Sequence, residues 1–281
     1  MGKYYICEKK KLISDGKKMK VLVLKPTKNK KPKEKTPCIL WIHGGGYRTG
    51  MAEMIYMSRA ISLVKKYGAV VVTPEYRLSH VAPYPAALED CYATLKYIKE
   101  HEKELRINPS QIMVGGESAG GGMTVALCMY ARDKGEVNIA FQMPLYPMLD
   151  DRDTESSKDN HAPVWNTKRN HKAWKLYLGK RWNKDVPVYA APARQTDYTN
   201  LPPAYTFVGD MEPFYCETLT YIENLKKAGI KAKVDIYPKC FHAFDMLLPF
   251  LKVSKKAIKR FEKQYLYASK YYYAEQNYSC K

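Results

Sequence analysis

The sequence of 281 residues contains no apolar run long enough to cross a membrane, and its first ten residues lack the apolar segment of a secretion signal. It also contains no Cys-x-x-Cys pair, and its seven cysteines are odd in number. These absences argue against a membrane span, a disulfide framework and a cysteine-based zinc site. We therefore expect a cytoplasmic protein that binds no metal.

Acidic residues are scarce, because 28 Asp and Glu stand against 47 Lys and Arg, for a formal net charge of +19. Nucleic-acid binding would require this charge on one face, together with base-stacking aromatic side chains. Lysine is instead spread along the chain, with one local cluster from Lys25 to Lys35. We interpret that cluster as a solvated loop and expect no nucleic-acid partner. The oligomeric state stays open.

Short apolar segments alternate with helix-like segments from Thr73 onward. This order predicts a mostly parallel central sheet with helices on both faces, and the length suits one α/β domain covering residues 1–281. The expected strands are residues 21–24, 38–42, 69–73, 112–115, 139–143, 205–208 and 234–237. The expected helices are residues 85–99, 119–132, 214–228 and 249–272. The Lys- and Pro-rich stretch between the first two strands is predicted to be a hairpin loop.

Residues 150–199 differ from the rest of the chain. The segment is polar, has no strand pattern, and carries Trp165, Trp174 and Trp182. Because it separates two predicted strands, we interpret it as an insertion over one edge of the sheet.

Residues 116–120 read Gly-Glu-Ser-Ala-Gly, which fits the G-x-S-x-G pattern. A predicted buried strand precedes the pattern and a predicted helix follows it, and such a tight turn exposes the serine. The alternative is a glycine-rich phosphate-binding helix start, but no lysine follows as a P-loop requires. Ser118 is therefore predicted to be a nucleophile.

Residues 43–46 read His-Gly-Gly-Gly directly after the predicted strand 38–42. Acyl transfer needs fixed N–H donors for the oxyanion, and glycines allow the main chain to approach closely. We predict that the N–H groups of Gly44, Gly45 and Ala119 are these donors. An ordinary glycine turn is the alternative, and His43 is expected to hold its loop by hydrogen bonds.

A base and an acid should follow the nucleophile in chain order. His242 lies just beyond the last predicted strand, so we predict it as the base. Asp210 and Glu212 both follow the strand 205–208, and either fits the position of the acid. Either carboxylate is equally compatible with a charge that stabilises a helix N-terminus.

Six segments together resemble the hormone-sensitive-lipase-like branch of the α/β-hydrolases, the microbial esterase and acetylesterase group. They are residues 43–46, 75–78, 84–90, 116–120, 201–204 and 242–244. Family members usually carry Asp before Pro as the acid, and here Glu212 precedes Pro213. The resemblance therefore favours Glu212 over Asp210. Ala243 replaces a usual glycine, and the N-terminal half of the family's helical cap is short or missing.

The resemblance implies an α/β-hydrolase fold with residues 150–199 as a lid. It further implies a serine esterase that hydrolyses short-chain carboxylic esters through a Ser-His-acid triad and an acyl-enzyme, without a cofactor. The expected partner is a small-molecule ester. Two alternatives remain, a peptidase or amidase on the same fold and a ligand-binding relative without catalysis.

Overall fold

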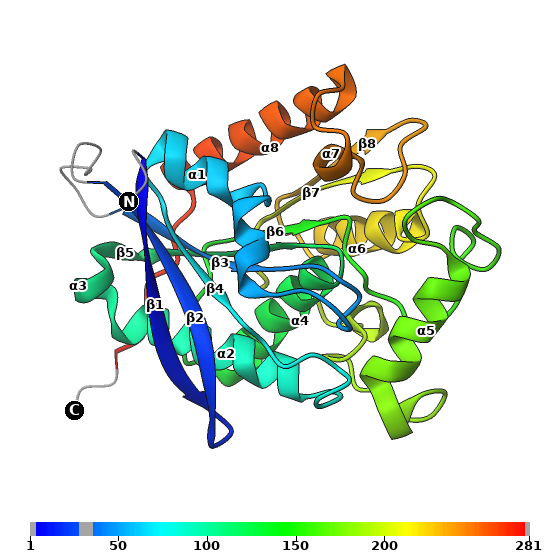
Figure 1. The fold of residues 1–281 in the computed structure, drawn as a ribbon, viewed down its shortest axis with the longest axis horizontal. Coiled ribbons are helices and arrows are strands. Elements are labelled where there is room, and N and C mark those ends of the chain that lie inside the picture. The colour runs from blue at the N-terminus through cyan, green and yellow to red at the C-terminus, as the bar shows by residue number, and fades with distance from the viewer. Residues whose placement is uncertain (1–3, 28–35, 279–281) are drawn as a thin grey trace.

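The computed structural model describes residues 4–27 and 36–278. Its central feature is one eight-stranded sheet in the order β1-β2-β4-β3-β5-β6-β7-β8 (Figure 1). The strands are β1 (Tyr5–Ser14), β2 (Lys17–Pro26), β3 (Thr36–Ile42), β4 (Val70–Pro74), β5 (Ile107–Glu117), β6 (Phe141–Leu145), β7 (Ala204–Gly209) and β8 (Ala232–Tyr237). The β1–β2 and β2–β4 pairs are antiparallel and all others are parallel. The prediction of a mostly parallel sheet is confirmed.

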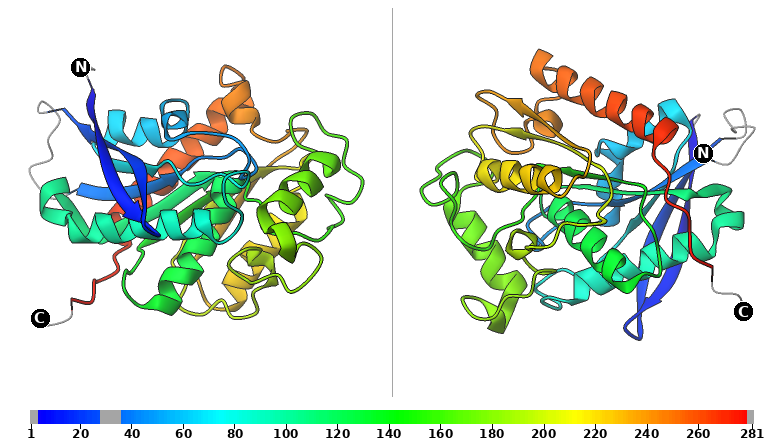
Figure 2. Two further views of the ribbon diagram at one scale, coloured as in Figure 1. Left: turned by 60° about the horizontal axis from the view of Figure 1, so that its bottom comes forward. Right: turned by 180° about the vertical axis from the view of Figure 1, so that it is seen from behind.

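Helices cover both faces of the sheet (Figures 1 and 2). One face packs against α1 (Ala60–Tyr67) and α8 (Lys252–Tyr271), and the other against α2 (Ala86–Glu100), α4 (Ala119–Lys134) and α6 (Tyr215–Lys227). Successive residues of β3 alternate between these two cores, with Leu40 in one and Trp41 in the other. Because both faces are buried, the inner strands are mostly apolar.

The remaining described helices are short or lie outside the two layers. They are α3 (Glu102–Leu105), α5 (Thr167–Leu178), α7 (Phe244–Leu247) and the 3-10 turns η2 (Ala52–Tyr56), η3 (Gly179–Arg181) and η4 (Pro192–Arg194). No helix among residues 4–27 and 36–278 combines the length and the apolar character that a membrane span requires.

The predicted hairpin between the first two expected strands is wrong. β4 lies between β2 and β3, and Val72 of β4 pairs with Val23 on one side and Leu40 on the other. With β4 between them, β2 and β3 each form backbone hydrogen bonds with β4 and do not pair with each other. Residues 28–35, which hold most of the lysine cluster, lie outside the described residues.

The sequence pattern missed β1 and α1 and placed the start of the last helix too early. β1 is an edge strand that pairs with β2 over its full length, and its side chains alternate between half-buried and exposed. Its charged run hides that alternation, because the half-buried Glu8 and Lys10 are also charged and form ion pairs with Lys25 and Glu104. The last helix begins at Lys252 instead of residue 249.

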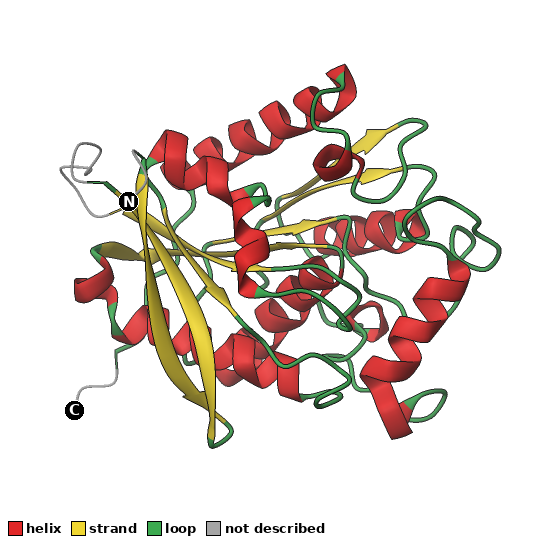
Figure 3. Cartoon of the chain, viewed as in Figure 1, coloured by secondary structure: helices red, strands yellow, loops and turns green. Residues whose placement is uncertain are grey.

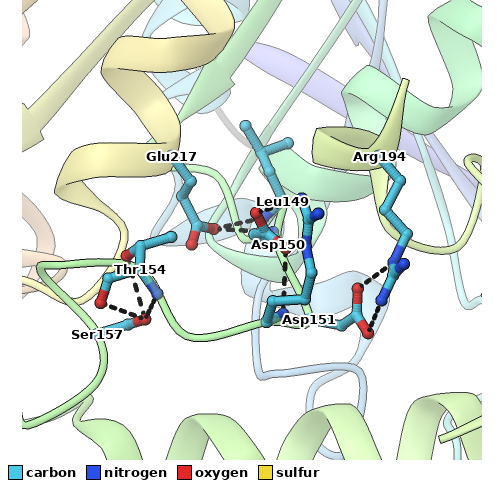
Figure 4. Close-up of polar contacts among 8 residues, drawn as sticks. Leu149, Asp150, Asp151, Thr154, Ser157, Arg194 and Glu217 are labelled. Atoms are coloured by element: carbon cyan, nitrogen blue, oxygen red, sulfur yellow. Dashed lines mark hydrogen bonds and ion pairs between the residues drawn. The ribbon is translucent and has the colours of Figure 1, made fainter. Parts of the chain in front are cut away.

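The segment 150–199 leaves the sheet after β6 and returns before β7, and it consists of helix and loop (Figure 3). An ion pair joins its two ends, and a buried carboxyl group of α6 holds the first end (Figure 4). Arg194 donates to both carboxylate oxygens of Asp151, at 2.6 and 2.9 Å. Glu217 of α6 accepts the backbone N–H groups of Leu149 and Asp150 at 2.6 and 3.3 Å. The neck of the insertion is therefore held against the sheet domain.

The end of β3 and the start of α4 are in direct backbone contact. A Cβ on Gly120 would lie 2.1 Å from the carbonyl oxygen of Ile42, and one on Gly116 would lie 2.5 Å from the same atom. Only glycine fits at such separations. This contact brings the two loops that follow β3 and β5 side by side.

We predict that Gly120→Ala destabilises the protein by about 3 kcal/mol or more, because backbone must move to admit the methyl group. Gly135→Ala is the matched control, since Gly135 caps the other end of α4 at φ 67° with open space around it. Its left-handed backbone should cost only about 1–2 kcal/mol. Denaturant unfolding measures both free energies, and equal losses would contradict the contact.

Candidate active site

Ser118 occupies the turn between β5 and α4 with a strained backbone, at φ 59° and ψ −122°. Hydrogen bonds hold this conformation. The Ser118 N–H donates to the carbonyl of Leu145, and the Ser118 carbonyl accepts from the N–H groups of Gly122 and Met148. A non-glycine residue at positive φ persists only where its surroundings determine it. The result is a sharp turn that directs the Ser118 side chain away from the sheet and toward His242.

Ser118, His242 and Glu212 form a hydrogen-bonded chain. The Ser118 hydroxyl donates to His242 Nε2 at 2.8 Å, and His242 Nδ1 donates to Glu212 Oε2 at 2.5 Å. Glu212 Oε1 accepts the N–H of Gly209 at 2.8 Å. All three side chains are buried, and Glu212 is fully so. The acceptor role of Glu212 sets the imidazole tautomer that leaves Nε2 free to take a proton.

Asp210, the alternative acid, is exposed and does not contact His242. Its carboxylate accepts the backbone N–H of Lys239 at 2.7 Å, which joins the loops after β7 and β8. The structure therefore brings Glu212, and not Asp210, to the imidazole.

Gly44 and Gly45 line the same cavity as Ser118, and Ala119 follows Ser118 in the chain. A Cβ on Gly44 would lie 3.2 Å from Ser118 Cβ, so the backbone passes directly beside the nucleophile candidate. Gly45 has φ 117°, and a Cβ there would lie 2.1 Å from the carbonyl oxygen of Thr49. Neither glycine N–H donates to another described residue. Ala119 is the first residue of α4, where the N–H has no acceptor within the helix.

His43 holds this glycine loop, as expected from the sequence. It is buried, its Nδ1 donates to the carbonyl of Gly44 at 2.8 Å, and its ring stacks on Tyr76. The Tyr76 hydroxyl in turn donates to the His43 carbonyl at 2.9 Å. Burial lowers the pKa of His43, so its imidazole stays neutral near pH 7.

A cavity of about 350 Å³ opens beside Ser118 and His242. Its walls are mostly apolar, and the insertion contributes Val164 and Trp165. The Trp165 ring lies 6.2 Å from the His242 ring and covers Gly46, where a Cβ would meet it at 2.4 Å. Trp174, by contrast, is buried against Tyr47 and Tyr177. The described part of the chain has no group of three or more His, Cys, Asp or Glu placed to bind a metal.

Two site residues were given no role from the sequence, although Glu117 lies within the pattern of residues 116–120. Tyr146 follows β6 at φ 35°, and its ring packs edge-on against His242 at 5.1 Å. Glu117 is buried behind Ser118, where Trp41 Nε1 donates to it at 2.7 Å. Burial raises the pKa of Glu117 to about 7. Sequence spacing cannot reveal either residue, because their partners come from distant strands.

Comparison with known proteins agrees with this geometry. The profile of a family described as the alpha/beta hydrolase fold matches residues 39–246. The chain belongs to this family. The resemblance to the hormone-sensitive-lipase-like branch is thereby confirmed, and with it the α/β-hydrolase fold.

Relatives of this α/β-hydrolase include proteins named as esterases. Esterase LipI of Mycobacterium tuberculosis is 31% identical over 74% of this chain and 65% of its own length. Carboxylesterase NlhH of the same species is 29% identical over 75% of this chain and 67% of its own. The chain thus spans about two thirds of the length of these curated relatives.

Among solved structures, a bacterial heroin esterase superposes with a TM-score of 0.90 at 33% identity, over 95% of this chain and 85% of its own. A Pyrobaculum calidifontis esterase superposes with a TM-score of 0.83 at 27% identity, over 92% and 84%.

We predict that Glu212→Gln slows the labelling of Ser118 by a fluorophosphonate by roughly 100-fold or more, because an amide no longer stabilises the protonated imidazole. Asp210→Asn should label at close to the wild-type rate, since the Asp210 carboxylate accepts the N–H of Lys239 and does not contact His242. Labelling rates at equal fold stability provide the comparison. The reverse ranking would show that the loop rearranges to use Asp210.

Proposed function

We propose that this protein is a serine esterase that hydrolyses carboxylic esters through Ser118, His242 and Glu212. The observation that carries the proposal is the hydrogen-bonded chain from Glu212 through His242 to Ser118 at the mouth of an apolar cavity. The relatives named as esterases support it, because the most similar of those described above match most of this chain.

The proposed reaction follows from the positions of these groups. His242 takes the Ser118 proton through Nε2 while Ser118 Oγ attacks the ester carbonyl. The N–H groups of Gly44, Gly45 and Ala119 stabilise the oxyanion. The protonated His242, held by Glu212, then protonates the leaving alcohol and leaves an acyl group on Ser118. A water molecule activated by His242 releases the acid.

The cavity supports small, uncharged esters as substrates. Its volume of about 350 Å³ is at the lower end of the roughly 300–1,000 Å³ that ligand pockets usually occupy. Its walls are largely apolar and include Met54, Ile55 and Met246. Such walls stabilise an apolar acyl or alcohol group through burial. The proposed substrate class is therefore the short-chain carboxylic esters.

The insertion 150–199 is proposed to act as the lid of this single domain. Trp165 forms the side of the cavity that the insertion supplies, and the ion pair of Arg194 with Asp151 holds its neck. The lid would therefore close the site from a fixed base, excluding water from the reacting carbonyl.

We predict that Ser118→Ala and His242→Ala each lower kcat for p-nitrophenyl butyrate by several orders of magnitude. The two losses should not add in the double variant, because the residues act as one unit. Far-ultraviolet circular dichroism confirms folding in each variant. Retention of more than about a tenth of wild-type turnover, a loss below about 1.4 kcal/mol, would refute the assignment.

A second prediction concerns acyl length. The small cavity leads us to expect the highest kcat/KM for acetyl to butyryl p-nitrophenyl esters, with a decline toward decanoyl. Steady-state kinetics across the series measures this profile. A maximum of kcat/KM at an acyl length of eight carbons or beyond would contradict the prediction, because so long a chain would have to extend out of the cavity.

A further inference from the structure

A buried cluster of charged groups lies behind the candidate site, on elements that the proposed reaction does not use. Glu117 precedes Ser118, and Asp245 follows His242 by three residues on α7. Arg59, at the start of α1, contacts both carboxylates. The cluster therefore joins the neighbours of the nucleophile and of the base.

Arg59 contacts the two carboxylates through different groups. Its backbone N–H donates to Glu117 Oε1 at 3.2 Å. Its side chain reaches the other way, with Nε 3.1 Å from Asp245 Oδ2. The Arg59 side chain is 11% exposed and the Asp245 side chain 0%. A change in the side chain thus cuts the link to Asp245 and leaves the backbone link to Glu117 in place.

We propose that Arg59 is a positioning residue that fixes the loop of His242 relative to the turn of Ser118. Asp245 has no other charged partner of opposite sign among the described residues, and neither of its oxygens has an aligned hydrogen bond there. The charge of Arg59 is therefore the one charged contact that holds the Asp245 carboxyl group, beside the neighbouring Tyr146 hydroxyl, and it is strong in a site with little water.

The neighbouring groups are consistent with this role. Burial raises the pKa of Asp245, while the charge of Arg59 and the neighbouring Tyr146 hydroxyl favour its ionised form. Ala243, between His242 and α7, has φ 59°. A positive φ at alanine is strained and needs outside contacts to persist. The anchored Asp245 supplies such a contact two residues away.

The test compares Arg59→Met with Arg77→Met as a matched control. The Arg77 side chain is 13% exposed, close to the 11% of Arg59, and it pairs with Asp90, whose side chain is 1% exposed. Its ion pair joins the segment after β4 to α2, away from Ser118 and His242. Both variants lose one buried cation, so both should lose stability. Only Arg59→Met should lower kcat for p-nitrophenyl butyrate, by tenfold or more with KM within threefold, because a shift of His242 weakens its 2.8 Å contact with Ser118.

Arg59→Lys, which keeps the charge, should recover at least a third of the wild-type kcat. Should Arg59→Met fail to fold, Asp245→Asn carries the test alone, because it keeps the shape of the side chain and removes its charge. The inference is overturned if Asp245→Asn and the folded Arg59 variants keep kcat within threefold of wild type. It is also overturned if Arg77→Met lowers kcat equally.

The inference rests on the proposed function only for the choice of substrate. The rate of Ser118 labelling by a fluorophosphonate reports nucleophile activation without any ester. A wild-type protein that labels quickly but hydrolyses no ester would refute the esterase proposal. Slower labelling of Arg59→Met than of Arg77→Met would then still support the positioning role, and equal labelling would refute it.

Discussion

The carbonyl oxygen of Ile42 lies so close to Gly116 and Gly120 that neither position has room for a side chain. This backbone contact between the end of β3 and the start of α4 determines where the site forms. It places the glycine loop after β3 beside the turn that carries Ser118. Gly44 and Gly45 therefore line the same cavity as Ser118.

Buried carboxylates are the second common feature of the site. The chain has few acids, yet Glu212, Glu117 and Asp245 are buried near Ser118 or His242, and Glu217 is buried at the neck of the insertion. Each of the three glutamates accepts at least one backbone N–H, from Gly209, Arg59 or Leu149. Backbone donors stabilise a buried charge without a mobile cation. Asp245 is the exception, and its dependence on the Arg59 side chain distinguishes it from the others.

Much of this arrangement can be predicted from local pattern. The inner strands are short, mostly apolar and bounded by turn residues, so β3, β4, β6, β7 and β8 were predicted within a few residues of their observed positions, and β5 was predicted without its first five residues. β1 was missed because its half-buried positions Glu8 and Lys10 are charged like the exposed ones between them, which hides the period of an edge strand. The order of strands was misjudged at β2, since sequence neighbours need not be neighbours in a sheet.

The sequence by itself determined the identity of the chemical groups, because Ser118, His242 and the glycines of residues 44–46 occur in patterns that few other structures require. Only the tertiary structure shows that Glu212 contacts His242 and Asp210 does not, since both residues follow β7. It alone also brought Trp165, Tyr146 and Arg59 to the site. These residues act through contacts between segments far apart in the chain, and such contacts depend on how helices and strands pack, which local spacing does not encode.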